Sequence, residues 1–203
     1  MKLLLHSCCA PCSIQCVQAL SEEDIKPELY WNNPNIHPYT EYRARRNALK
    51  TFAEKEKLAL CMDDDYGLKS FVNAVENEIM GATAFSSAYQ KEDSSFSRCT
   101  FCYWLRLDRT ARYAAMKEYE AFSTTLLISP YQNHDLIRQT GEELAAFYGV
   151  EFLYRDFRPR FREGQNQARA ASYYMQKYCG CIYSEEERYL GKACGAEASG
   201  GSQ

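Results

Sequence analysis

The sequence lacks any apolar run that approaches the roughly 20 residues that a membrane-spanning helix requires. Its first residues, Met1 to His6, resemble a signal peptide only briefly, and no small-residue cleavage site follows them. The turn after this run also lacks a glycine-rich loop, which excludes a Walker A phosphate site and a dinucleotide-binding fingerprint there. We therefore expect a cytoplasmic protein, with no membrane partner, whose first turn serves another chemistry.

Cysteine, in contrast, is abundant, with ten residues in a chain of 203. Stable disulfides are rare in the reducing cytoplasm, so a disulfide framework is not the expected reason for this number. Metal binding or catalytic redox chemistry explains it better.

The net charge of −3 conceals two basic segments. Residues 43–57 contain six basic and two acidic side chains, and residues 155–169 contain five basic and two acidic ones. Because phosphate groups respond to local charge, a weakly acidic protein with basic faces can still bind RNA. Charge alone favours a simpler interpretation, in which both segments are solvated helix faces.

Segments that favour strands alternate with segments that favour helices. We expect strands at 2–6, 27–31, 58–62, 123–129 and 150–154, and helices at 12–20, 40–57, 134–148 and 165–178. This alternation predicts a parallel sheet and an α/β fold. Residues 66–119 break the rhythm and predict a helical insertion, interrupted by a polar segment at 89–97. We expect one domain over residues 1–190 and a flexible tail over 191–203.

Three polar or reactive loops follow strands of this predicted sheet. The cysteine-rich turn follows the first strand, the Asn/Pro segment 32–38 follows the second, and the loop with Arg158 and Arg160 follows the fifth. The carboxyl ends of parallel strands share one edge, where sites form in open sheets. The three loops are therefore expected to meet there.

The densest chemical motif is Cys8-Cys9-Ala10-Pro11-Cys12. Metals bind the thiolate form of cysteine, and a helix start at Cys12 favours that form. A C-x-x-C motif at Cys99 and Cys102 places two more sulfurs on one face of a helix start. Two cysteines of the first motif with this pair make four thiolates, the number for tetrahedral zinc or a 4Fe–4S cluster.

A C-x-C motif at Cys179 and Cys181 can form a strained, easily reduced disulfide ring, or it can present two thiolates to one metal. Together the three motifs have more thiols than a closed structural zinc site needs, which favours a redox metal site. We interpret Cys16, Cys61 and Cys194 as non-ligands, since free cysteine is often a small buried hydrophobe.

The histidines are weaker candidates. His6 is expected to be a hydrogen-bonded core residue, whereas His37 in the Asn/Pro segment and His134 after the fourth strand could contact a substrate. Aromatic residues from Tyr30 to Tyr42 lie beside arginines, which suits stacking on an unpaired base and contact with its phosphates. With sixteen tyrosines in the chain, such neighbours also arise by chance.

These motifs resemble the cobalamin-independent epoxyqueuosine reductase family (QueH) over nearly the whole chain except the tail. The matching segments are Leu3 to Cys12, Trp31 to Pro38, Tyr42 to Arg46, Arg98 to Arg106, Thr124 to Gln132, Tyr154 to Arg158, Gly164 and Tyr178 to Cys181. The resemblance implies a Rossmann-like (HUP-like) fold and an oxidoreductase of queuosine biosynthesis. Its substrate would be a tRNA with a GUN anticodon, in which epoxyqueuosine at wobble position 34 is reduced to queuosine.

The resemblance also implies roles for particular residues. Cys8, Cys9, Cys99 and Cys102 would bind a 4Fe–4S cluster. Cys179 and Cys181 would be redox-active, as a disulfide or as ligands of a second, mononuclear iron or zinc ion, which Cys12 could join. An external electron donor, which the sequence does not identify, would supply electrons. We expect tRNA on the two basic faces, with contacts from Asn33, His37, Tyr42, Arg43, Arg46, Tyr131 and Arg158.

Two other functions remain open at this stage. One is a zinc-stabilised RNA-binding module without catalysis, and the other is a thiol–disulfide oxidoreductase that acts on proteins. A brown protein would indicate an iron–sulfur cluster, whereas a colourless zinc protein or a colourless metal-free protein with a titratable disulfide would indicate the alternatives.

Overall fold

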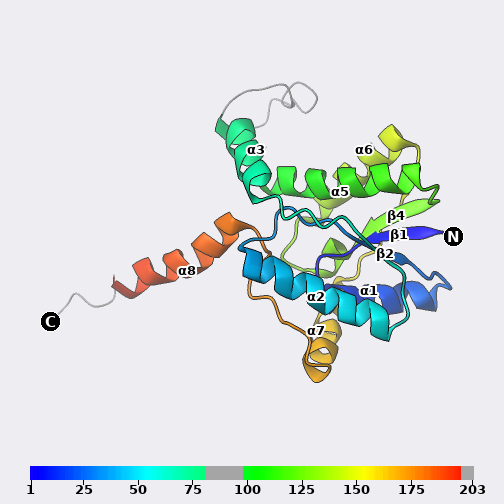
Figure 1. Ribbon diagram of the computed structural model, residues 1–203, viewed down its shortest axis with the longest axis horizontal. Helices are drawn as coiled ribbons and strands as arrows, with labels where there is room; N and C mark the ends of the chain where they lie inside the picture. Colours follow the sequence, from blue (N-terminus) through cyan, green and yellow to red (C-terminus); the bar gives the residue numbers. More distant parts are fainter. Residues whose placement is uncertain (81–97, 198–203) are drawn as a thin grey trace.

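The computed structural model describes residues 1–80 and 98–197, and it has a central parallel sheet with helices on both faces (Figure 1). In these residues the sheet has the order β3-β2-β1-β4-β5, and every ladder is parallel. The strands are β1 (Leu3–His6), β2 (Glu28–Trp31), β3 (Leu60–Met62), β4 (Ala121–Thr124) and β5 (Glu151–Phe152). This order is Rossmann-like, so the predicted α/β class is confirmed.

The helices form two layers around the sheet. Figure 1 shows α1 (Ala10–Glu22), α2 (Tyr39–Lys55) and α7 (Phe161–Ala170) on one face, and α5 (Arg98–Met116) and α6 (His134–Tyr148) on the other. Because both faces are covered, β1 is a continuous apolar strand whose leucines are at most 1% exposed. α3 (Leu68–Met80) packs against α5, and α8 (Ile182–Glu197) extends away from the body.

Local signals explain where several helices begin and end. The Cys9 side chain accepts a hydrogen bond from the Cys12 amide at the start of α1, where Pro11 occupies the first turn. Asn133 caps α6 through the Leu136 amide, and Gly149 ends that helix in the left-handed conformation at φ +68°. The helix predicted over 134–148 is therefore confirmed at both ends.

Two predicted elements differ most from the structure in extent. The strand predicted at 123–129 ends at Thr124, because the Thr124 hydroxyl accepts from the Leu126 amide and begins a 3-10 helix, η1 (Thr125–Ile128). The helix predicted at 165–178 is α7, which starts earlier and ends at Ala170, and Ser172 then adopts φ +56°. A second 3-10 helix, η2 (Arg158–Arg160), lies in the predicted basic loop. The C-x-C motif is therefore reached by an irregular segment.

The region after β3 contains the helices expected there. α5 begins at Arg98 and packs against β1, β4 and α6, so it connects β3 to β4 across one face of the sheet. The predicted interruption at 89–97 lies outside the described residues, and the insertion and the domain limits stay predictions. The segment from 191 is helical as far as Glu197. In the described part of the chain, no helix is long and apolar enough to cross a membrane.

Candidate thiol and metal site

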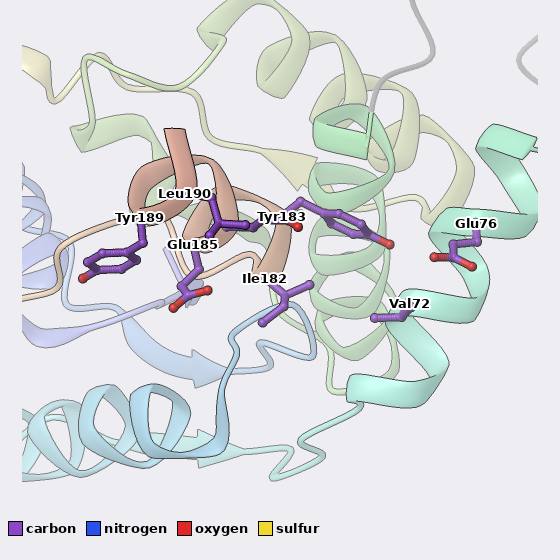
Figure 2. A pocket seen from close by; sticks show the side chains of 8 residues that line it. Val72, Glu76, Ile182, Tyr183, Glu185, Tyr189 and Leu190 are labelled. Carbon is purple, nitrogen blue, oxygen red and sulfur yellow. The ribbon is translucent and has the colours of Figure 1, made fainter. Parts of the chain in front are cut away.

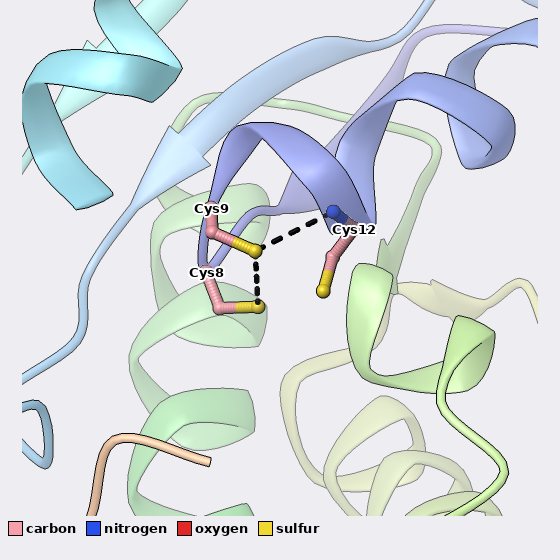
Figure 3. A group of neighbouring side chains, drawn as sticks. All are labelled: Cys8, Cys9 and Cys12. Atoms are coloured by element: carbon pink, nitrogen blue, oxygen red, sulfur yellow. Dashed lines mark hydrogen bonds between the residues drawn. The ribbon is translucent and has the colours of Figure 1, made fainter. Parts of the chain in front are cut away.

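Three cysteine sulfurs gather where β1 ends and α1 begins. Cys8, Cys9 and Cys12 are buried, and their Sγ atoms all lie within 4.8 Å of one another (Figure 3). The sulfurs of Cys8 and Cys9 are 3.8 Å apart, and the Cys12 amide donates to the Cys9 sulfur at 3.4 Å. Among the described residues this is the one such group of possible metal ligands. Its position at the carboxyl edge of the sheet is the one predicted.

The three thiols are not electrostatically equivalent. Hydrogen bonds from the thiols of Cys12 and Cys9 hold the pKa of Cys8 well below its usual range. Burial raises the pKa of Cys9, and the hydrogen bond with Cys8 is the largest influence raising that of Cys12. One thiolate is therefore stabilised by two thiol donors, which favours metal binding at this turn.

The C-x-x-C and C-x-C motifs lie on other elements. Cys99 and Cys102 are in the first turn of α5, where Cys99 is exposed and Cys102 is buried. Cys181 is buried in one apolar cluster with Cys102, Phe101 and Phe71, whereas Cys179 is exposed. Cysteines 8, 9, 12, 16, 61, 99, 102, 179 and 181 are free thiols. Ligand sulfurs around a four-iron cluster stand farther apart than around one ion, because each sulfur binds its own iron.

Two buried arginines accompany these thiols. Arg45 is 1% exposed, and its charge acts on Cys9 and Cys8. Arg106 is 3% exposed, donates from Nη2 to the Cys102 sulfur at 3.1 Å, and acts electrostatically on Cys8 as well. Since buried cations require negative partners, this environment suits thiolates better than neutral thiols. The donor set therefore fits a thiolate-bound metal group.

The segment that carries the C-x-C motif, residues 174–181, is held against the rest of the site. Gln176 donates from Nε2 to the sulfurs of Cys9 and Cys12, at 3.1 and 3.3 Å. Arg45 donates to the carbonyls of Tyr178 and Cys179, at 2.9 and 3.0 Å. Contacts from one segment to the first cysteine turn and to α2 bring the C-x-C backbone to the same edge of the sheet.

The Asn/Pro segment lies between these parts. The Asn33 side chain donates to the Ser7 carbonyl at 3.0 Å, next to the cysteine turn, and the His37 amide donates to the Gly180 carbonyl at 2.8 Å. The expected meeting of the first two loops is confirmed. The helix after the third loop reaches the cysteine turn, since a Cβ on Gly164 in α7 would lie 3.2 Å from the Pro11 carbonyl. In the loop itself, Arg160 pairs with Glu22 at the other end of α1, so the meeting of the third loop with the first two stays a prediction.

His6 is a core residue, as expected. Its ring is fully buried, with Nε2 3.2 Å from the Asn32 carbonyl and Nδ1 2.9 Å from the Thr124 hydroxyl. Because a carbonyl only accepts, Nε2 carries the proton and Nδ1 accepts from Thr124. His134 is also buried, beside the Ser129 carbonyl.

The residues predicted to contact tRNA fall into two groups. Asn33, His37 and Tyr42 are at most 1% exposed, so they lie beneath the surface. The others reach solvent. Tyr131 is 83% exposed and Arg43 is exposed, whereas Arg46 pairs with Asp64 and Arg158 with Asp156.

An apolar hollow of about 570 Å³ opens beside the C-x-C motif, between α3 and the first turns of α8 (Figure 2). Val72 and Leu190 contribute to its apolar lining, and Glu76, Glu185 and Glu186 add carboxylates. These charges repel phosphates, so the hollow is a poor surface for RNA.

Sequence reasoning missed Arg106, Gln176 and the Glu41–Arg45 pair as parts of the site. The spacing of Arg106, four residues after Cys102 on a predicted helix, was an available signal, since such residues share a helix face. Nothing in the sequence near Gln176 indicated that it reaches Cys9.

Fold and site together define a Rossmann-like α/β protein with a buried thiol centre at the carboxyl edge of its sheet. The model of the family described as epoxyqueuosine reductase QueH matches residues 3–187. The chain therefore belongs to this family, as the motifs predicted.

Similar proteins support that assignment. Epoxyqueuosine reductase QueH of Dehalococcoides mccartyi is 35% identical over 93% of this chain and 94% of its own length. The proteins of the same name from Thermotoga maritima and Acinetobacter baylyi are each 33% identical, over 92% and 90% of this chain and 91% and 80% of their own lengths.

Proposed function

We propose that this protein reduces epoxyqueuosine at position 34 of a GUN-anticodon tRNA to queuosine, in the cytoplasm. The reaction breaks both C–O bonds of the epoxide, takes up two electrons and two protons, and yields the alkene and water. The buried Cys8-Cys9-Cys12 group, found in a chain of this family, is the observation that carries the proposal. An external electron donor supplies the electrons.

Cys8, Cys9, Cys99 and Cys102 are the proposed ligands of a 4Fe–4S cluster, which when bound supplies single electrons. The fit rests on the chemistry of the donors. Cys8 has a stabilised thiolate, Cys102 receives a hydrogen bond from a guanidinium, and both cysteines are buried. Burial keeps water from the sulfurs and strengthens each of these electrostatic contacts.

Cys12, Cys179 and Cys181 are the proposed reactive thiols, either as ligands of a second iron or zinc ion or, for the C-x-C pair, as a reversible disulfide. Gln176 supports this grouping because it joins the C-x-C segment to the Cys12 sulfur. Arg45 orients the same segment through two backbone carbonyls. These contacts support a position of the reactive thiols near the proposed cluster ligands.

tRNA is proposed to approach the carboxyl edge of the sheet. Tyr131 offers an exposed ring for stacking on a base, and Arg43 offers an exposed cation for phosphates. Arg46 and Arg158 are proposed to contact phosphates by exchanging their carboxylate partners Asp64 and Asp156. Asn33, His37 and Tyr42 are buried beneath this surface and support its loops. The hollow between α3 and α8 contains three glutamates, so we expect RNA on the opposite side of the C-x-C segment.

The test is anaerobic reconstitution with iron and sulfide, a visible spectrum with metal analysis, and nucleoside analysis of treated tRNA. Cys99→Ala should abolish the brown chromophore and the conversion. Cys16→Ala is the matched control, because Cys16 is buried on α1 but lies outside the tight sulfur group, and it should retain both. Full conversion by Cys99→Ala contradicts the cluster assignment, and a colourless zinc protein favours the RNA-binding alternative.

A further inference from the structure

Arg106 is a buried cation whose hydrogen-bond partners lie on Cys102. Its side chain is 3% exposed, Nε donates to the Cys102 carbonyl at 3.0 Å, and Nη2 donates to the Cys102 sulfur at 3.1 Å. Within residues 1–80 and 98–197 it forms no ion pair with a carboxylate, whereas the other buried arginine, Arg45, pairs with Glu41 at 2.6 Å. Among the described residues, Arg45 has a carboxylate partner and Arg106 has sulfur and carbonyl partners on Cys102.

An unbalanced buried charge is costly. Removing a guanidinium from water costs several kcal/mol unless an opposite charge and hydrogen bonds compensate. The largest electrostatic contributions that favour the charged form of Arg106 come from sulfurs, namely Cys102 in direct contact and Cys8 at a distance, with smaller ones from Tyr103 and Cys179. The positive charge of Arg106 therefore favours anionic sulfur at the site.

We propose that Arg106 is a positioning residue that raises the reduction potential of the metal group bound through Cys102. This inference rests on the proposed function, in which Cys102 is a cluster ligand. One-electron reduction, with the electron taken from an external reductant, adds a negative charge to the cluster. A cation fixed nearby in a low-dielectric interior stabilises the reduced form more than the oxidised form. Hydrogen bonds to ligand sulfurs shift the potential in the same direction.

The placement of Arg106 on α5 suits this role. It lies one helical turn after Cys102, and its backbone carbonyl accepts from the buried Thr110 hydroxyl at 2.7 Å. Its guanidinium lies 5.9 Å from the centre of the Tyr103 ring. The guanidinium is held on its own helix by the hydrogen bond from Nε to the Cys102 carbonyl, so it needs no substrate to bring it to the sulfur.

The experiment is a redox titration of the reconstituted full chain, followed by electron paramagnetic resonance of the reduced cluster, with dithionite as reductant. Four proteins are compared: wild type, Arg106→Gln, Arg106→Lys and Arg112→Gln. Arg112 is the matched control, since it lies on the same helix but is exposed, where solvent screens its charge. We expect Arg106→Gln to shift the midpoint potential to more negative values, Arg106→Lys to stay closer to wild type, and Arg112→Gln to match wild type.

Iron and sulfide analysis and thermal unfolding accompany each titration. An Arg106→Gln variant that binds no cluster, beside an Arg106→Lys variant that does, also supports the need for a cation. The inference is overturned by an Arg106→Gln potential equal to that of Arg112→Gln, by equal shifts in Gln and Lys variants, or by loss of the cluster in both. A wild-type protein that binds no cluster contradicts the proposed function instead.

Discussion

At the scale of the residue, the site depends on cysteine side chains whose pKa values are shifted in opposite directions. The Cys8 thiol has a lowered pKa because two neighbouring thiols donate to it, whereas burial raises the pKa of Cys102 to about 12. The Cys102 thiolate therefore needs a cation or a metal, and Arg106 supplies the cation. Position in the fold thus distinguishes cysteines that are chemically identical in the sequence.

Gly180, between the two cysteines of the C-x-C motif, cannot be replaced without strain. It has φ +115°, and a Cβ there would lie 3.0 Å from Ile36 Cγ1 and 3.2 Å from Arg45 Nη1. We expect Gly180→Ala to lower the free energy of unfolding by about 3 kcal/mol in urea titrations.

Gly149→Ala is the matched control for that substitution. Gly149 also has a positive φ, but no atom lies within 4 Å of its added Cβ. Gly149→Ala should lower the free energy of unfolding by only about 1 kcal/mol, which is the cost of a positive φ for a residue with a Cβ. Equal losses in the two variants would show that the contacts of Gly180 with Ile36 and Arg45 are unimportant.

The buried histidines make stability sensitive to acid. Burial lowers the pKa of both His6 and His37 to about 4, from 6.5. Between these values the unfolded chain binds protons that the folded chain does not, so stability falls as pH falls from 6.5 towards 4. For His6 the full loss in the free energy of unfolding is about 3 kcal/mol.

Urea unfolding of the metal-free protein at pH 7 and pH 4 measures this loss, and His6→Gln should reduce the pH dependence of the free energy of unfolding. An unchanged dependence in that variant would rule out His6 as a source.

At the scale of the element, the C-x-C segment is an irregular stretch that α2 stabilises. Glu41 and Arg45 lie one turn apart on the buried face of α2 and pair with each other. The hydroxyl of Tyr174 donates to Glu41, and that of Tyr178 donates to the His37 carbonyl. Because the segment has no ladder of its own, these side chains replace the hydrogen bonds that regular structure would provide.

Removal of Arg45 should therefore release this segment. Arg45→Met leaves the Glu41 carboxylate buried without its cation, and we expect a loss of about 3–5 kcal/mol in the free energy of unfolding. Cys181 is buried in the wild-type protein, and in metal-free Arg45→Met it should react faster with an alkylating reagent than in the metal-free wild type.

Arg138→Met is the control, because Arg138 and Glu142 form an i,i+4 pair of the same residue types, in the reverse order, on an exposed helix face. Exposed pairs contribute little, so the expected change is within about 0.5 kcal/mol. A similar small change for Arg45→Met would contradict the proposed role of the buried pair.

At the scale of the whole molecule, the surface is less basic than the sequence indicates. Several arginines of the two basic segments pair with acids elsewhere in the chain, including Arg155 with Glu23 and Arg160 with Glu22. Phosphate affinity therefore depends on fewer free cations, and stacking on exposed rings becomes more important.

Tyr131 provides the test of that surface. Tyr131→Ala should weaken tRNA binding by about 10-fold, since stacking on a base contributes about 1–3 kcal/mol. The thermal midpoint should change little, because the ring is 83% exposed.

Phe147→Ala controls for loss of an exposed aromatic ring. Phe147 is 78% exposed at the far end of α6, away from the carboxyl edge, and its loss should leave tRNA binding unchanged. Filter-binding titrations at fixed salt compare the two, and equal affinities would place the tRNA elsewhere.

The sequence by itself determined the class of fold, the family and the edge at which the first two loops meet. These depend on local patterns, namely strands that alternate with helices and short motifs at strand ends. It predicted the end of the fourth strand and the limits of α7 wrongly, because a Thr124 side-chain cap and the positive φ of Ser172 override apolar and helical periodicity. Only the tertiary structure decided which of the described thiols have lowered or raised pKa values and which of the described arginines pair with carboxylates. Those properties depend on burial and on partners far apart in the chain, such as Gln176 with Cys9, which no local pattern encodes.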